Sequence, residues 1–230
     1  MLYMQTCVNS EIVLMTNYFQ AKNISCNRGG KCVFKGLSFS LQSGGALILR
    51  GPNGSGKSSL LRMMAGLITP AAGELLWNKE SISQDPFFHR DRIHYLGHFD
   101  AVKPALTVGE NLAVWQKLRS YGLSGKQGEK KALERALIAF NMLHLVDLPA
   151  RLLSSGQSRR LALARLLANN AALWLLDEPA KGVDYSSRHA LEEIVSEHQV
   201  AGGMVVISVH GPSNLKNTHT LNLSLNATLK

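Results

Sequence analysis

Residues 51–58 constrain the fold more than any other part of this sequence. They read Gly-Pro-Asn-Gly-Ser-Gly-Lys-Ser and match the phosphate-loop pattern G-x-x-x-x-G-K-[S/T]. The apolar run 46–49 precedes this loop, and residues 58–65, which have a helical composition, follow it. In a strand-loop-helix unit of this kind, backbone N–H groups turn inward around phosphate oxygens. A chance glycine-rich turn is the alternative, but it leaves the two flanking elements unexplained.

The loop therefore predicts a site for ATP and Mg²⁺. Lys57 would place a positive charge on the β- and γ-phosphates, and the Ser58 hydroxyl would be a ligand of Mg²⁺. The candidate ATP-binding residues of this segment are Gly51, Pro52, Asn53, Gly54, Ser55, Gly56, Lys57, Ser58 and Ser59.

A second candidate site follows the continuously apolar run 172–176, which predicts a strand buried on both faces of a parallel sheet. Asp177 ends this strand and could hold Mg²⁺, usually through water. Glu178 could polarise the attacking water, so it is a candidate catalytic residue. The alternative is a pair of acids that cap a strand at the surface.

Small residues at 154–157 precede a segment that carries Arg159 and Arg160. Backbone N–H groups at the start of a helix form an anion site, and the small residues here predict a second one. In a single subunit two anion sites would be redundant, unless the second serves another nucleotide. A simple serine N-cap is the alternative.

The order of the predicted elements indicates an α/β fold with a parallel sheet and crossover helices. Strands are expected at 46–49, 75–77, 172–176 and 204–209, and helices at 58–65, 111–119, 129–140, 159–167 and 187–198. Most of the residues between about 85 and 155 have a helical pattern, which predicts a helical subdomain.

Composition narrows the function classes. The chain has 230 residues, a net charge of +9 and three cysteines. The basic residues are scattered, which fits a dispersed solubility charge as well as it fits an anionic partner, and no DNA-reading module is present. No apolar run approaches the roughly 18 residues of a membrane span. Residues 1–18 lack the pattern of a signal peptide, so we expect a cytoplasmic chain that meets the membrane through a partner.

Over residues 19–211 the chain resembles the nucleotide-binding subunits of ABC transporters. In that comparison, 51–58 is Walker A, 172–177 is Walker B, and Leu153-Ser154-Ser155-Gly156-Gln157 is the signature loop, with Ser155 where the family more often has glycine. Asp184 occupies the D-loop position and His210 the position of the catalytic switch histidine.

The resemblance implies a P-loop NTPase with a parallel-sheet core, a small antiparallel β subdomain and the helical subdomain. It also implies a head-to-tail homodimer, in which Ser154, Ser155, Gly156 and Gln157 act in trans on the partner's nucleotide. Residues 1–18 would be an N-terminal extension, with a start placed too early, and 212–230 a C-terminal tail.

Two positions depart from the general family pattern. Arg28 stands where an aromatic residue usually lies under the adenine, and its guanidinium plane can also stack on a base. His98 stands at the position of the Q-loop glutamine. It could contact metal-bound water, ligate Mg²⁺ poorly or add pH sensitivity; alternatively, it is merely tolerated and contacts the partner subunit.

These departures make the chain similar to the haem-exporter ATP-binding subunits of cytochrome c biogenesis. The short segments that also match are Cys26, 51–53, 75–77, 95–98, 110–112 and 202–204. That resemblance implies integral-membrane partner subunits, a peripheral position on the cytoplasmic face of the bacterial inner membrane, and no nucleic-acid partner. Alternatives are an exporter subunit for a lipid or small peptide, a soluble ABC protein that acts on ribosomes or DNA, and a P-loop kinase or GTPase.

Overall fold

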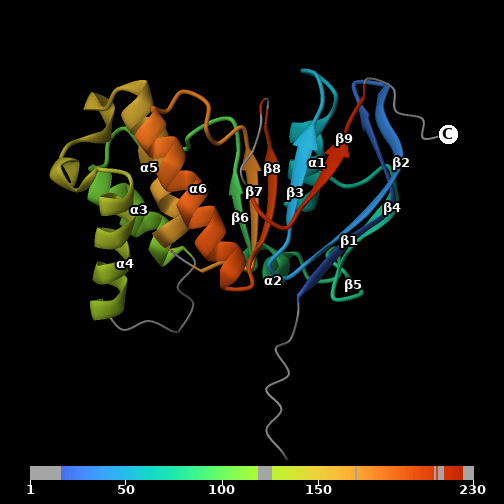
Figure 1. Ribbon diagram of the computed structural model, residues 1–230, viewed down its shortest axis with the longest axis horizontal. Helices are drawn as coiled ribbons and strands as arrows, with labels where there is room; N and C mark the ends of the chain where they lie inside the picture. The colour runs from blue at the N-terminus through green and yellow to red at the C-terminus, as the bar shows by residue number, and fades with distance from the viewer. Residues whose placement is uncertain (1–16, 119–125, 169, 210, 212–214, 225–230) are drawn as a thin grey trace, which may run out of the picture.

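The computed structural model describes residues 17–118, 126–168, 170–209, 211 and 215–224 (Figure 1). Within them the chain forms two sheets, with helices packed on both faces of the parallel one. The predicted α/β fold class, including the small antiparallel sheet and the helical region, is confirmed.

The central sheet is parallel and has the strand order β6-β7-β8-β3-β9. Its strands are β3 (Ala46–Arg50), β6 (Ile93–Leu96), β7 (Leu173–Asp177), β8 (Met204–Ser208) and β9 (Thr218–Asn222). The loop 51–56 follows β3, and the two candidate carboxylates lie at the end of β7. Because neighbouring parallel strands end at the same edge, the sheet brings these segments together.

The second sheet is antiparallel, with the order β2-β1-β4-β5. It consists of β1 (Tyr18–Arg28), β2 (Lys31–Gln42), β4 (Ala72–Trp77) and β5 (Glu80–Ser81). Gly29 and Gly30, both with positive φ, connect β1 to β2 in a tight turn. Arg28 is the last residue of β1 and is therefore presented beside this turn.

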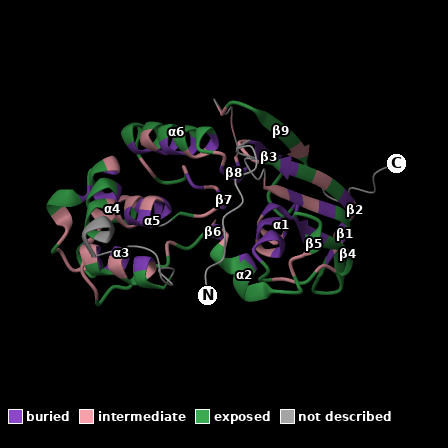
Figure 2. Cartoon of the chain, turned by 90° about the horizontal axis from the view of Figure 1, so that it is seen from below, coloured by how far each residue is buried: buried purple, intermediate pink, exposed green. Residues whose placement is uncertain are grey.

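The helices divide into two groups around the parallel sheet. The first group, α1 (Lys57–Met64) and α2 (Pro86–Asp91), lies on the same side of the parallel sheet as the antiparallel sheet. The other side of the parallel sheet carries α3 (Val108–Lys117), α4 (Lys126–Ala139), α5 (Ser155–Ala168) and α6 (Tyr185–Val200) (Figure 2). Two short 3₁₀ turns, η1 (Leu143–Leu145) and η2 (Ala150–Leu152), join α4 to α5. A capping box between Thr107 and Glu110 starts α3.

The central strands are apolar throughout because their side chains enter a hydrophobic core on each face of the sheet. In β7, Leu173 and Leu175 join the core on the side of α1 and the antiparallel sheet. Trp174 and Leu176 join the core under α3, α5 and α6. Successive side chains of a strand point to opposite faces, so a sheet covered on both faces needs apolar residues at every position.

Three predicted boundaries differ from the structure. The stretch 85–155 contains β6, a strand of the parallel sheet, so the helical region starts after it. The predicted tail 212–230 contains β9, which pairs with β3 over residues 218–222 through backbone hydrogen bonds. The helix expected from Arg159 begins at Ser155, so the last three signature residues form its first turn.

Candidate nucleotide site

The phosphate loop connects the buried end of β3 to α1. Gly56 is the N-cap of α1 and has a φ of 99°, in the left-handed region that favours glycine. A Cβ atom at this position would lie 2.6 Å from Val33 Cγ1 of the hairpin above it. The close packing of β2 on the loop therefore requires glycine, and it holds the helix N-terminus at the site.

Lys57 lies inside the loop that precedes it. Its Nζ donates hydrogen bonds to the carbonyl oxygens of Gly51, at 2.7 Å, and Pro52, at 3.0 Å. Ser55 is 1% exposed, and its Oγ has no hydrogen-bond partner among the described residues. A buried hydroxyl without a partner is costly, so Ser55 fits a loop that supplies donors to a phosphate.

A serine of the neighbouring strand holds both acidic residues at the end of β7, Asp177 by its side chain and Glu178 by its backbone. Ser208 Oγ donates to Asp177 Oδ1 at 2.9 Å and accepts from the backbone N–H of Glu178 at 2.8 Å. Asp177 is 2% exposed, and its Oδ2 has no hydrogen-bond partner within the described part of the chain. A buried carboxylate oxygen of this kind fits a metal ion or its water, so Asp177, with Ser58, could hold Mg²⁺.

A cavity of about 520 Å³ lies between these segments. The predicted site residues that line it are Arg28, Asn53, Gly54, Gly56, Lys57, Ser58, Ser59, His98 and Glu178. The residues predicted as the adenine platform, the phosphate loop, the Q-loop histidine and the catalytic carboxylate therefore face one space. His210 lies outside the described residues.

None of the signature residues lines this cavity among the described residues. Ser154 and Gln157 form a capping box instead: the Ser154 N–H donates to Gln157 Oε1 at 2.8 Å, and the Gln157 N–H donates to Ser154 Oγ at 3.2 Å. The serine N-cap that the sequence left open is thus present within the chain. Ser155 lines a separate cavity of about 170 Å³ beside Glu178 and His98.

The D-loop residue Asp184 is the N-cap of α6. Its Oδ1 accepts from the Ser187 N–H and from Ser186 Oγ, both at 2.8 Å. The hydrogen bond from the Ser187 backbone, with others from the Ser187 and Ser186 side chains, lowers the pKa of this carboxyl to about 2. Asp184 therefore remains a carboxylate at any physiological pH.

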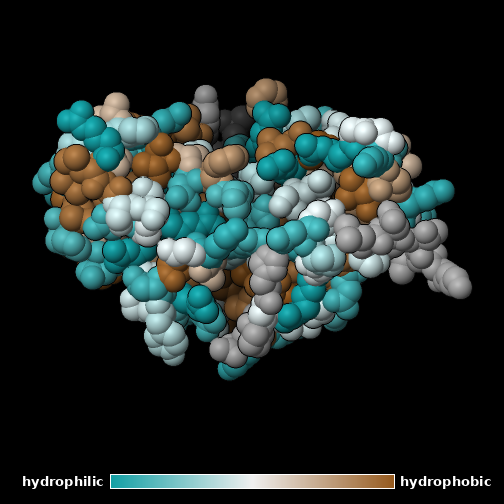
Figure 3. All heavy atoms as spheres, turned by 90° about the horizontal axis from the view of Figure 1, so that it is seen from above, coloured by the Kyte–Doolittle hydropathy of each residue, from teal (hydrophilic) through white to brown (hydrophobic). Residues whose placement is uncertain are grey.

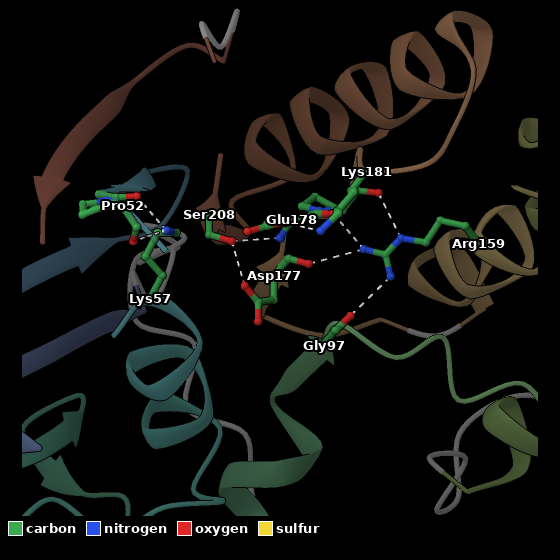
Figure 4. A network of polar contacts seen from close by, with 10 residues as sticks. Pro52, Lys57, Gly97, Arg159, Asp177, Glu178, Lys181 and Ser208 are labelled. Carbon is green, nitrogen blue, oxygen red and sulfur yellow. Dashed lines mark hydrogen bonds and ion pairs between the residues drawn. The ribbon is translucent and has the colours of Figure 1, made fainter. Parts of the chain in front are cut away.

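Two cations of the site have contacts that the sequence did not predict (Figure 4). Lys181 Nζ lies 3.5 Å from Glu178 Oε2, and Lys181 lines the 520 Å³ cavity. Arg159 is 6% exposed and points inward, to the backbone at Asp177 and Glu178, rather than toward an anion at the start of α5. The sequence shows that Lys181 and Arg159 lie close to the motifs along the chain. The direction in which each side chain points depends on tertiary packing and could not be predicted.

Comparisons with known proteins agree with this geometry. The ABC transporter family matches residues 34–181. A cytochrome c biogenesis ATP-binding export protein from Paramagnetospirillum magneticum is 51% identical over 205 residues, which cover 89% of this chain and 93% of that protein. The protein of the same name from Rhodospirillum rubrum is 48% identical over 205 residues, or 89% of this chain and 85% of that one.

Solved structures show the same fold. A Pyrococcus furiosus protein described as an ABC transporter (ATP-binding protein) has a TM-score of 0.76 at 26% identity, over 90% of this chain and 97% of that one. A dimeric ATP-binding cassette in a post-hydrolysis state with ADP and Pi has a TM-score of 0.73 at 23% identity, over 84% of this chain and 88% of that one. Within the described residues, no helix has the length and apolarity needed to cross a membrane. The chain belongs to the family of ABC transporter ATP-binding subunits.

Proposed function

We propose that this chain is the ATP-hydrolysing subunit of an export system of cytochrome c biogenesis, and that the system delivers haem. The observation that carries ATP hydrolysis is the cavity that Lys57, Ser58 and Glu178 line together. A triphosphate in this cavity would have its phosphates at the start of α1 and a carboxylate across from them. The high identity to the named export proteins supports the role in cytochrome c biogenesis.

The residues of the site have different roles in phosphoryl transfer from ATP to water. Lys57 and the N–H groups at the start of α1 bind and orient the phosphates. Asp177 and Ser58 would hold Mg²⁺, which neutralises charge on the phosphate oxygens. Glu178 orients the attacking water and accepts its proton, and His98 faces the same cavity from the end of β6.

The signature loop completes the site from a second copy of the chain. Ser154 and Ser155 are exposed, the loop starts a helix of 14 residues, and it does not line the 520 Å³ cavity of its own subunit. Its helix N-terminus is therefore available to the γ-phosphate of a partner. A head-to-tail homodimer would place a signature loop on each nucleotide, and the dimeric state of the ATP-binding cassette with ADP and Pi supports dimerisation.

Mixing two inactive variants tests the shared site. Lys57→Ala removes the phosphate lysine, and Gly156→Asp places a carboxylate where the partner's phosphate would lie. Each homodimer should lose at least about 100-fold in turnover. A mixed dimer has one composite site with both halves intact, so dimers purified through two different tags should recover a large part of the single-site activity. Two variants that remain inactive together would contradict the shared site.

A second variant tests the role of Glu178. Glu178→Gln keeps the size of the side chain and removes the base, so MgATP should still bind while turnover falls by at least about 100-fold. The blocked ATP state should accumulate as a dimer in size-exclusion chromatography. Normal hydrolysis by this variant would show that Glu178 is not the base.

Export requires membrane subunits, and an exposed apolar residue marks where they could dock. Phe99, next to His98, is 81% exposed. Seen from the edge where the parallel strands end, apolar surface also gathers over the helical side of the molecule (Figure 3). We propose that the membrane subunits, on the cytoplasmic face of the inner membrane, bind this side.

A cellular experiment tests the role in biogenesis. A strain that lacks the gene should lose haem-stained c-type cytochromes. The intact chain should restore them, and Glu178→Gln should not, although both chains should be recovered with the membrane fraction. Normal cytochromes in the strain without the gene, or full rescue by Glu178→Gln, would reject the proposal.

A further inference from the structure

Arg159 connects two segments of the nucleotide site to the helix that carries the signature loop. Its Nε donates to the Pro179 carbonyl at 3.2 Å, and its Nη2 donates to the carbonyls of Asp177, at 3.3 Å, and Glu178, at 2.9 Å. Three consecutive carbonyl groups at the end of β7 thus converge on one guanidinium group, as Figure 4 shows.

The remaining nitrogen binds the loop after β6. Nη1 donates to the Gly97 carbonyl at 3.3 Å and to Asp100 Oδ1 at 2.9 Å. These two residues flank His98, which lines the nucleotide cavity. The Arg159 side chain is 7% exposed and that of Asp100 is 27% exposed, so the ion pair is largely shielded from water. Such a buried cation is stable only because every nitrogen is bonded and a carboxylate balances its charge.

The backbone at Glu178 needs this support. Glu178 has a φ of 48°, a left-handed conformation that is unfavourable for a residue other than glycine. Ser208 holds the N–H of Glu178, and Arg159 holds its carbonyl oxygen. Both peptide groups on either side of the Glu178 Cα are therefore fixed, and this fixes the direction in which its side chain leaves the backbone.

We propose that Arg159 is a positioning residue that sets the catalytic carboxylate and the His98 loop of its own subunit, although its helix serves the partner's nucleotide. This inference rests on the proposed two-subunit site. Through Arg159, α5 and the backbone of Glu178 move as one unit. A shift of α5 when its signature loop meets the partner's ATP is then passed to the hydrolytic group of the other site, which would couple the two sites.

The first test compares steady-state ATP hydrolysis by Arg159→Lys and Asp100→Asn with the unchanged chain. Lysine keeps the charge but cannot reach five acceptors with a planar fork. Because Arg159 does not line the nucleotide cavity, kcat should fall about tenfold or more while KM for ATP changes by less than about threefold. Arg151→Gln, an exposed arginine of η2 without contacts to the site, is the matched control and should behave as the unchanged chain.

Melting curves accompany these assays, so that kcat is compared only among chains folded at the assay temperature. A folded Arg159→Lys chain with kcat within about twofold of the unchanged chain would overturn the proposal. A rise in KM by the same factor as the fall in kcat would also overturn the proposal, since that pattern indicates a damaged binding site.

The second test uses the mixed dimer of Lys57→Ala and Gly156→Asp chains. Its single intact site takes Glu178 from the Gly156→Asp chain and the signature loop from the Lys57→Ala chain. Arg159→Lys in the Gly156→Asp chain should abolish most of the recovered activity, and the same change in the Lys57→Ala chain should leave most of it. The reverse pattern, or equal losses, would overturn positioning within the same subunit. A parent mixture without activity would instead reject the shared site, and the kcat test above would still decide the role of Arg159.

Discussion

Ser208 Oγ lies 2.9 Å from Asp177 Oδ1, and this contact joins the ends of β8 and β7. The same hydroxyl oxygen accepts the N–H of Glu178 at 2.8 Å, so one fully buried side chain orients both residues of the acidic pair. Its donor is used by Asp177 and its acceptor by Glu178. The second carboxylate oxygen, Asp177 Oδ2, has no hydrogen-bond partner among the described residues and could bind Mg²⁺ or its water.

Ser208→Ala should impair both stability and metal use. The substitution leaves a buried carboxylate oxygen and a partly buried N–H without their partner, which costs about 1–3 kcal/mol of unfolding free energy. The Mg²⁺ concentration for half-maximal hydrolysis should rise, because Asp177 loses the bond that orients it. Urea denaturation and Mg²⁺ titration of ATPase activity measure the two effects. Ser196→Ala, on the exposed side of α6, is the control, and equal behaviour of both variants would contradict this role.

Arg28 should act on nucleotide affinity alone. It lines the cavity from the end of β1. Base stacking is worth about 1–3 kcal/mol, so Arg28→Ala should raise KM for ATP at least about fivefold and leave kcat almost unchanged. Arg28→Tyr should restore affinity because it supplies an aromatic face. Lys31→Ala, in the same hairpin but not lining the cavity, is the control; an unchanged KM in Arg28→Ala would remove Arg28 from the adenine site.

Lys181 contributes positive charge beside the phosphate site. Its ion pair with Glu178 is 64% exposed on the lysine side, so it adds little to stability. Lys181→Glu replaces a cation by an anion in the cavity, and KM for MgATP should rise about tenfold at low salt and less at high salt. Lys79→Glu makes the same charge change on an exposed turn outside the cavity. If both variants have the same KM, Lys181 does not act on the nucleotide.

The sequence predicted those parts of the site that local pattern specifies. The loop between β3 and α1 has a fixed motif, and β7 has an uninterrupted apolar run because both of its faces are covered. These signals do not depend on the rest of the fold. Helices α1 and α3 to α6 were predicted in the same way, although α5 begins four residues before the expected start at Arg159 because polar residues form its first turn.

Other features could not be predicted from the sequence because they depend on contacts between residues that are far apart in the chain. β9 reads Thr-His-Thr-Leu-Asn and is mostly exposed, so neither hydropathy nor alternation marks it; its backbone pairing with β3 makes it a strand. Arg159 was read as part of a basic helix start. Its actual partners at 97–100 and 177–179 become neighbours only when β6 and β7 pair.

His198 gives the fold a specific sensitivity to acid. Its ring stacks on Trp174 with centroids 3.9 Å apart, and its Nε2 has no hydrogen-bond partner among the described residues. Burial lowers the pKa of His198 to about 4, with a smaller opposing effect from a hydrogen bond to the backbone of Met204. The unfolded chain takes up a proton near pH 6.5, whereas the folded chain keeps the ring neutral until about pH 4. Acid therefore favours the unfolded state.

Stability should consequently decrease as pH falls from about 6.5 toward 4, with up to about 3 kcal/mol due to His198. Urea denaturation at pH 7 and pH 5 measures the change. His198→Phe preserves an aromatic ring on Trp174 but cannot take up a proton, so its stability should decrease less over this interval, whatever its stability at pH 7. The exposed His144 offers the control His144→Gln, which should keep the acid sensitivity of the unchanged chain. An identical pH dependence in His198→Phe and the unchanged chain would show that His198 is not responsible.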